Sequence, residues 1–175
     1  SQISQAEAKK FFIERFRISK WRRTGIIWWN LIDGWPQISD AIVDYYYTKK
    51  LAYHYIKRSQ NPVCLMFGEP VDNVISLYGV NDTIYDVDVS YKVTDVIADG
   101  KVVLEGKSIL TGDTSLLINE LTIDNNQKTF YLIEWEINGK SYKNHYFTNI
   151  LDINYDTYME AIRKCGFDEF EGFDE

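Results

Sequence analysis

Seven short β-rich runs after Asn61 constrain the fold more than any other feature of the sequence. They alternate apolar and polar residues and are separated by turn signals, and Asp99-Gly100 and Asn138-Gly139 are hairpin dipeptides. Seven such runs fit an antiparallel, immunoglobulin-like β-sandwich. A helix is expected over Tyr155–Lys164, ending at Gly166. The runs are PVCLMFG, NVISLYGVN, YDVDVSYKVTDV, KVVLEGKSIL, SLLINELTI, TFYLIEWEI and SYKNHYFTN.

The N-terminal third has a different pattern. Residues 4–17 are typical of an amphipathic helix, in which Ser4 and Glu7 have capping-box spacing and apolar residues recur with helical period, namely Ala8, Phe11, Phe12 and Phe16. The unbroken apolar run GIIWWN, residues 25–30, predicts a strand buried on both faces, as in a parallel sheet. A long loop and a second helix over 48–58 follow. Because a parallel strand needs paired neighbours, residues 1–58 are expected to be an incomplete βα piece of a larger α/β fold.

Charge separates the same two units. Residues 1–60 have a net charge of +6 and residues 61–175 a net charge of −13. The acidic part argues against nucleic acid as a partner, because binding it requires neutralising phosphates. No apolar segment is long enough for a membrane helix, so no membrane partner is expected. The sequence leaves the cellular location open.

Metal and cofactor signatures are not found. Cys64 and Cys165 lie far apart and are expected to be buried free thiols, and His54 and His145 have no metal-ligand spacing and are expected to be structural. Asp86 and Asp88 alternate on one strand without the glycine and glutamate of an EF-hand loop. Asn81-Asp82-Thr83 is formally a glycosylation sequon. We therefore expect no metal and no cofactor.

Tryptophans gather in the N-terminal part. Four of the five lie between Trp21 and Trp35. Aromatic rings stack on the apolar faces of pyranose rings, while Asn30, Asp33 and Gln37 offer hydrogen bonds to sugar hydroxyls. The segment therefore indicates a carbohydrate site.

The segment GIIWWNLIDGWPQISDAIVDYYYTKKLAYHYIKR resembles the last strand, loop and helix of the (β/α)8 barrel of glycoside hydrolase family 2, in particular its β-mannosidase branch. The matching pieces are WN at Trp29 and Asn30, D-x-W-P from Asp33 to Pro36, and S-x-A-I-V-D-Y-Y from Ser39. Residues 61–175, including VNDT at 80–83, are more weakly similar to the β-sandwich that follows that barrel.

The resemblance implies a retaining mechanism with two glutamates on earlier barrel strands. Glu7 and Glu14 precede residue 61 but lie on the predicted helix, so no catalytic residue is assigned here and the isolated chain is expected to be inactive. What the resemblance transfers to this chain is a substrate-binding wall, made of Trp29, Asn30, Asp33 and Trp35. It also implies the remainder of the barrel as a partner and a β-glycoside as substrate.

Several alternatives stay open. Trp28 and Trp29 are adjacent on a predicted strand, so one of them belongs to the core, and Asp33 is equally suited to bracing its loop. A βα piece without its barrel is expected to form a homodimer. The rival hypothesis is a self-sufficient carbohydrate-binding sandwich that uses exposed aromatics, namely Tyr78, Tyr85, Tyr91, Trp135 and Tyr142.

Overall fold

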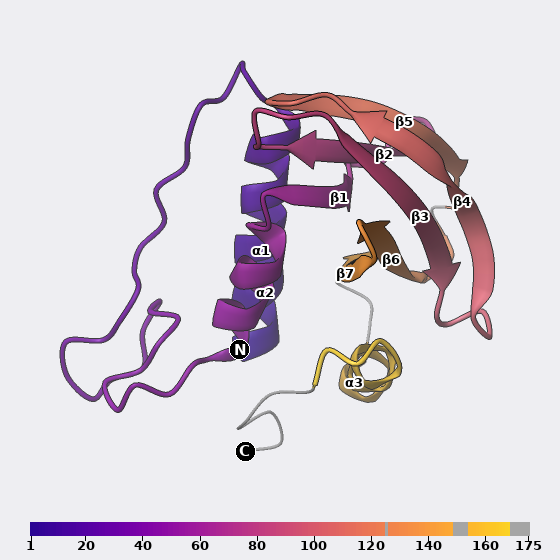
Figure 1. Cartoon of the computed structure of the whole chain (residues 1–175). Coiled ribbons are helices and arrows are strands. Elements are labelled where there is room, and N and C mark those ends of the chain that lie inside the picture. The colour runs from indigo at the N-terminus through magenta and orange to yellow at the C-terminus, as the bar shows by residue number, and fades with distance from the viewer. Residues whose placement is uncertain (125, 149–153, 169–175) are drawn as a thin grey trace.

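The computed structural model describes residues 1–124, 126–148 and 154–168. Within these residues, three helices and seven strands follow one another (Figure 1). The helices are α1 (Gln2–Ile18), α2 (Leu51–Ser59) and α3 (Tyr155–Lys164). The strands are β1 (Val63–Phe67), β2 (Val74–Asn81), β3 (Val87–Asp95), β4 (Lys101–Leu110), β5 (Thr114–Thr122), β6 (Phe130–Ile137) and β7 (Lys140–Phe147).

The strands form two antiparallel sheets, ordered β1-β2-β5 and β4-β3-β6-β7. A two-residue turn joins β6 to β7, and both of its residues, Asn138 and Gly139, have positive φ, as a tight hairpin requires. Asp99 and Gly100 have the same conformation before β4. The expected sandwich with its C-terminal helix, and with it the mixed fold class, is confirmed.

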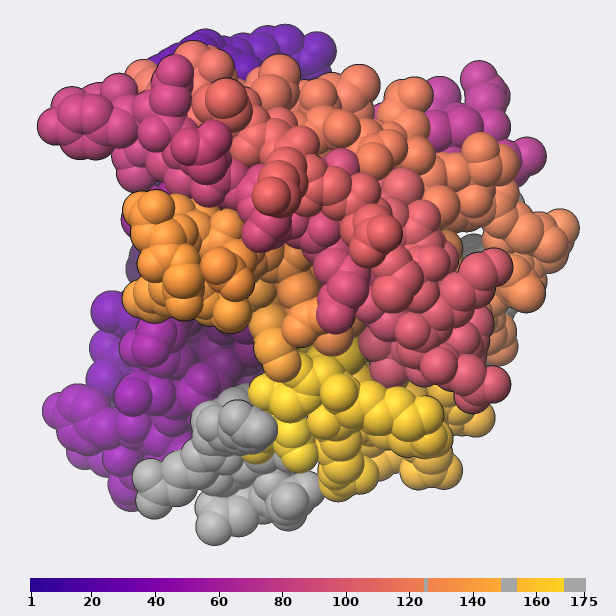
Figure 2. All heavy atoms as spheres, turned by 45° about the vertical axis from the view of Figure 1, so that its right-hand side comes forward, coloured from indigo at the N-terminus to yellow at the C-terminus, as the bar shows by residue number. Residues whose placement is uncertain are grey.

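One apolar core fills the space between the sheets, and a second lies between the helices and the sheet. The first includes Leu65, Leu77, Ile133 and Trp135, and the second joins Ala52 and Tyr55 of α2 to residues of β6 and α3. Cys64 and Cys165 are both free and buried, as predicted. In Figure 2, α3 (yellow) lies below the strands and covers one end of the sandwich.

The predicted strand at residues 25–30 does not form. This segment runs outside any strand, and Ile27 is 98% exposed. The apolar run was correctly identified, but a strand also needs an adjacent backbone to pair with, and none of the described strands lies beside it. Residues 19–50 instead leave the top of α1 and return to α2 as a long loop, which touches the sandwich at Lys20 and Trp21 and then runs on the other side of the helices from the sheets (Figure 1).

The face of α1 that packs against the core is opposite to the face that its sequence predicts. Phe11 and Phe12 are 42% and 54% exposed, whereas Lys10 and Glu14 are buried. The capping box is not formed either, because the helix begins at Gln2 with Ser1 as its N-cap. Periodicity marks a helix and its apolar face, but it cannot show that polar partners elsewhere will bury the other face.

Those polar partners come from β1 and β7. The carboxylate of Glu14 pairs with Lys10 Nζ at 2.8 Å and accepts a hydrogen bond from Asn144 Nδ2 at 2.8 Å. The same amide donates to the carbonyl of Leu65 on β1 at 2.9 Å. A buried ion pair is stable only when such additional hydrogen bonds complete it. These contacts fix α1 against both sheets.

Glu7 makes the second buried contact. Its Oε1 lies 2.8 Å from Nε2 of His145 on β7 and accepts a hydrogen bond from the hydroxyl of Tyr158 on α3, which in turn contacts the hydroxyl of Tyr55 at 2.6 Å. Burial would raise the pKa of Glu7, but His145, Lys10 and the Tyr158 hydroxyl lower it to about 2. Burial lowers the pKa of His145 to about 4, against the opposing effect of Glu7. At neutral pH the pair is therefore a carboxylate and a neutral imidazole.

The basic and acidic parts of the sequence meet at the C-terminal end of α1. Arg17 and Lys20 both bind the carboxylate of Asp82 at 2.8 Å, and Lys20 also reaches Asp113 at 2.8 Å. Asn81, next to this cluster, is fully buried, and its Nδ2 donates to the carbonyls of Tyr85 and Leu110. The nitrogen that a glycan would occupy is thus engaged, so the sequon is not accessible in the folded chain. None of the described helices is long and apolar enough to cross a membrane.

Replacing Glu7 tests the buried contact. Glu7→Gln keeps the size of the side chain but removes the charge that accepts from His145 and Tyr158, so we expect a loss of about 2–4 kcal/mol in the free energy of unfolding. Urea denaturation followed by circular dichroism measures it. Glu160→Gln is the matched control, because Glu160 forms only an exposed pair with Lys164 and should change nothing measurable. Equal effects of the two substitutions on the free energy of unfolding would contradict the stabilising role assigned to the Glu7 contact.

The same contact predicts acid sensitivity. The pKa of His145 is about 4 in the folded chain and about 6.5 when unfolded, so the unfolded state takes up the proton first as pH falls. Stability should be complete above about pH 6.5 and decrease towards pH 4, by on the order of 3 kcal/mol from His145. Burial and three nearby cations also lower the pKa of His54 to about 4, which adds to the loss in the same window. Urea titrations at pH 7.0, 5.5 and 4.5 measure the slope, and His145→Gln should flatten it. A slope unchanged by that substitution would contradict the assignment.

Candidate functional site

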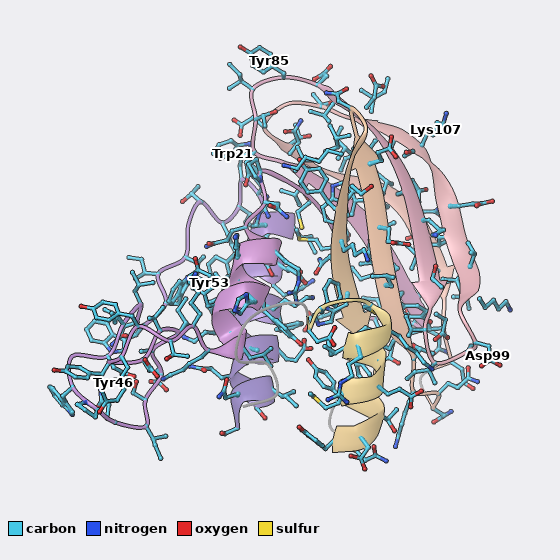
Figure 3. The ribbon with its side chains drawn as sticks, turned by 60° about the horizontal axis from the view of Figure 1, so that its bottom comes forward. Trp21, Tyr46, Tyr53, Tyr85, Asp99 and Lys107 are labelled. Carbon is cyan, nitrogen blue, oxygen red and sulfur yellow. The ribbon has the colours of Figure 1, made fainter. Side chains whose placement is uncertain are left out.

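The candidate site is the loop between α1 and α2, which exposes aromatic side chains on a hydrogen-bonded frame. The loop starts at the sandwich, where Trp21 Nε1 donates to the carbonyl of Asp113 at 3.1 Å. Figure 3 shows Trp21 at this end and Tyr46 at the opposite, outer tip of the loop. The exposed large apolar residues along it are Trp21, Ile27, Trp29, Leu31, Ile32, Trp35, Ile38, Tyr45, Tyr46 and Tyr47.

Trp28 and Trp29 have different environments, as their adjacency predicted. Trp28 is partly buried against the helical core, and Nζ of Lys9 lies 5.1 Å from the centre of its ring. Trp29 is 76% exposed, and its carbonyl accepts a hydrogen bond from Lys9 Nζ at 2.9 Å. The peptide bond between Trp29 and Asn30 is cis. The hydrogen bond from Lys9 ties the backbone of Trp29 to α1, while the indole ring of Trp29 faces solvent.

Trp35 also faces solvent, with 65% of its surface exposed. Asn30 is half-buried, and its carbonyl accepts from the amide of Ile42 at 3.3 Å. Its side-chain Oδ1 is buried and has no hydrogen-bond partner among the described residues. The loop therefore presents two indole rings and a half-buried amide within seven residues of sequence.

Asp33 is placed differently from the two tryptophans, because it is 4% exposed. One carboxylate oxygen accepts from Gln37 Nε2 at 3.1 Å and from the hydroxyl of Ser39, and the other from Lys50 Nζ at 3.2 Å. The hydrogen bond from the Ser39 hydroxyl has the largest effect and lowers the pKa of Asp33, and the hydrogen bonds from Gln37 and Lys50 lower it further. Asp33 is thus an ionised carboxylate held inside the loop.

The sequence pattern points to Asp33 but not to its partners Ser39 and Lys50. The signal was present, because a buried carboxylate needs donors and both residues follow it within the same loop. The turn at Asp44 is local as well, with Oδ1 accepting from the amides of Tyr46 and Thr48 at 2.8 Å. It directs Tyr46 and Tyr47 into solvent, where they are 71% and 78% exposed.

The two glutamates of α1 are engaged elsewhere: Glu14 binds Lys10 and Asn144, and Oε1 of Glu7 contacts His145 and Tyr158. They lie against the sandwich rather than in the loop. Among the described residues, no three His, Cys, Asp or Glu side chains converge in a way that would hold a metal ion.

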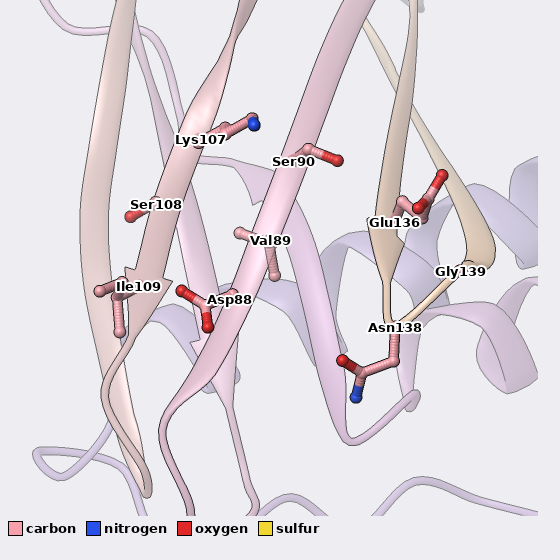
Figure 4. A pocket seen from close by; sticks show the side chains of 9 residues that line it. All are labelled: Asp88, Val89, Ser90, Lys107, Ser108, Ile109, Glu136, Asn138 and Gly139. Atoms are coloured by element: carbon pink, nitrogen blue, oxygen red, sulfur yellow. The ribbon is translucent and has the colours of Figure 1, made fainter.

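A hollow lies on the sandwich, with a volume of about 490 Å³ (Figure 4). Its walls come from β3, β4 and the β6–β7 hairpin and include Asp88, Ser90, Lys107 and Glu136. No aromatic ring lines it. The hollow therefore lacks the flat apolar surface on which a sugar ring stacks.

Fluorescence quenching tests the exposure of the loop tryptophans. Trp29→Phe and Trp35→Phe should each remove emission that acrylamide quenches readily, because both rings face solvent. Trp135→Phe is the control and should remove emission that resists quenching, since Trp135 is 2% exposed. Loss of only quench-resistant emission in the Trp29 variant would contradict the structure.

Comparison with known proteins supports the resemblance seen in the sequence. No family model matches the chain. Beta-mannosidase B of Aspergillus niger is 39% identical over 69 residues, which cover 37% of this chain and 8% of that protein. The crystal structure of a β-D-mannosidase from Dictyoglomus thermophilum has a TM-score of 0.71 and 26% identity, over 83% of this chain and 19% of that one.

An exo-chitosanase from Amycolatopsis orientalis shares the fold, with a TM-score of 0.61 and 18% identity over 83% of this chain and 18% of that one. The chain thus spans only 8% to 19% of the length of these relatives. In sequence and in fold, it matches the C-terminal region of family 2 glycoside hydrolases, with β-mannosidases among its relatives.

Proposed function

We propose that this chain forms part of a retaining glycoside hydrolase that acts on β-mannosides or related β-glycosides. Residues 1–58 would close the end of the catalytic barrel, and residues 61–175 would form the accessory sandwich beside it. The names of the relatives, two β-mannosidases and an exo-chitosanase, support a carbohydrate substrate.

The observation that carries the proposal is the exposure of Trp29 and Trp35 on an internally bonded loop. Large aromatic rings in solvent are costly unless a ligand or partner covers them, and indole faces suit the C–H faces of a pyranose ring. In the proposed site, Trp29 orients the sugar and excludes water from one side of it. Asn30 lies at the base of this wall.

The catalytic pair is proposed to lie outside these 175 residues. A retaining enzyme needs two carboxyl groups about 5–5.5 Å apart, on either side of the glycosidic bond. Glu7 and Glu14 are each engaged in buried hydrogen bonds on α1, which supports giving them structural roles. The chain's own contribution is then binding and orientation of the sugar ring.

A self-sufficient sugar-binding sandwich is the weaker candidate. Of its five proposed aromatics, Trp135 and Tyr91 are buried between the sheets, and Tyr142 stacks on Trp135 with ring centres 5.7 Å apart. Tyr85 is 72% exposed but lies in a loop before β3. The rings therefore serve mainly as core and form no continuous platform.

The test uses the native gene product that contains this chain, assayed with 4-nitrophenyl β-D-mannopyranoside. Trp29→Ala should lower kcat/KM by about tenfold or more, because the stacking contact is lost. Tyr85→Ala is the matched control and should leave kcat/KM within about twofold, since it removes an equally exposed aromatic from the sandwich.

Two outcomes would overturn the proposal. One is a native product no longer than 175 residues, because the catalytic carboxylates would then have no source. The other is loss of activity in the Tyr85 variant with the Trp29 variant unaffected, which would favour the binding sandwich. The isolated 175-residue chain should show no turnover of the same substrate.

A further inference from the structure

The carboxylate of Asp33 holds together three parts of the exposed loop. Its two oxygens accept from Gln37, Ser39 and Lys50, which are 4, 6 and 17 residues further along the chain. The Asp33 side chain itself is fully buried and that of Lys50 is 17% exposed. Both oxygens therefore accept hydrogen bonds from the chain's own donors. A sugar hydroxyl could bind the carboxylate only by displacing one of these donors.

Backbone hydrogen bonds converge on the same place. The amide of Asp33 donates to the carbonyl of Val43 at 3.1 Å, and the amide of Val43 donates to the carbonyl of Leu31 at 3.0 Å. The amide of Lys50 donates to the carbonyl of Ile42 at 2.9 Å. Isolated bridges pair Ile32 with Val43 and Val43 with Lys49. Residues 30–33, 41–43 and 49–50 are thus three short segments joined by isolated bridges, and they form a small frame in a loop that has no helix or strand of its own.

We propose that Asp33 is a positioning residue, which fixes the frame of the loop so that Trp29 and Trp35 present their rings to the sugar, and which does not itself contact substrate. The inference rests on the proposed function for its sugar-binding part. It also replaces the sequence-based expectation that Asp33 belongs to the substrate-binding wall.

Because the frame lies outside the sandwich, loosening of the frame can be measured separately from the stability of the whole chain. The partners of Asp33 all lie within the loop and the residue that precedes α2, and none comes from a strand of the sandwich. The outer part of the loop, which ends in Tyr46, lies on the other side of α1 and α2 from the sheets (Figures 1 and 3). Loss of the carboxylate should therefore loosen residues 30–50 and leave the sandwich folded.

Hydrogen–deuterium exchange on the 175-residue chain measures that loosening. Asp33→Asn should speed exchange at the amides of Val43 and Lys50 by about tenfold, because a charge-assisted contact to Lys50 is lost. Exchange in β6 and β7 should not change. Asp40→Asn is the matched control, since Asp40 is an exposed carboxylate of the same loop, and it should leave all these amides unaffected. Unchanged exchange in the Asp33 variant would overturn the proposal.

A double-mutant cycle in the native enzyme tests the route to the sugar. If Asp33 acts only by placing the rings, Asp33→Asn should lower kcat/KM on its own but have much less effect in a Trp29→Ala, Trp35→Ala background. Effects that simply multiply would mean that Asp33 binds substrate directly, and would overturn the proposal. If the native product has no glycosidase activity, the proposed function fails, while the exchange experiment still decides whether Asp33 holds the loop.

Discussion

The structure depends on the charged face that α1 turns towards the sandwich. Burying Glu7, Lys10 and Glu14 together is costly unless each finds a partner, and each does. Asn144 and His145, adjacent on β7, supply two of these partners, and Tyr158 brings α3 to the same carboxylate as His145. A buried polar network that is only partly satisfied is less stable than an apolar core. Loss of one of these contacts is therefore expected to weaken the others. They hold the helices, and through α1 one end of the exposed loop, against the sheets.

Local signals predicted the sandwich well, because strands and tight turns leave local marks. The hairpin at Asn138-Gly139 is visible as a dipeptide whose two residues adopt positive φ. Helix α3 was predicted with its bounds, since its last turn and Gly166 mark its end. The facing side of α1 could not be predicted in this way. Its partners lie 130 to 151 residues further along the chain, and periodicity contains no information on them.

For the loop between α1 and α2, the sequence identified the residues of interest but not the local structure that holds them. The aromatic cluster and its resemblance to a known family could be identified from residues 24–58 alone. Trp28 packs partly against the core and Trp29 faces solvent, although the strand that was expected to separate them does not form. The strand expected at 25–30 required a neighbouring strand that the described residues do not provide. The sequence left two roles open for Asp33, and the geometry of Gln37, Ser39 and Lys50 favours the bracing role.

The long sequence separation of the α1 contacts also has a consequence for synthesis. The ribosome adds about 5–20 residues per second and makes α1 before β7 and α3, so the side chains that bind Glu7 and Glu14 are added at least 130 residues later. Until then Glu7 has water as its partner and Glu14 has Lys10 of the same helix, while Phe11 and Phe12 are exposed on the other face. Docking of α1 against β7 and α3 therefore has to follow the synthesis of these elements, and contacts of such high sequence separation form slowly.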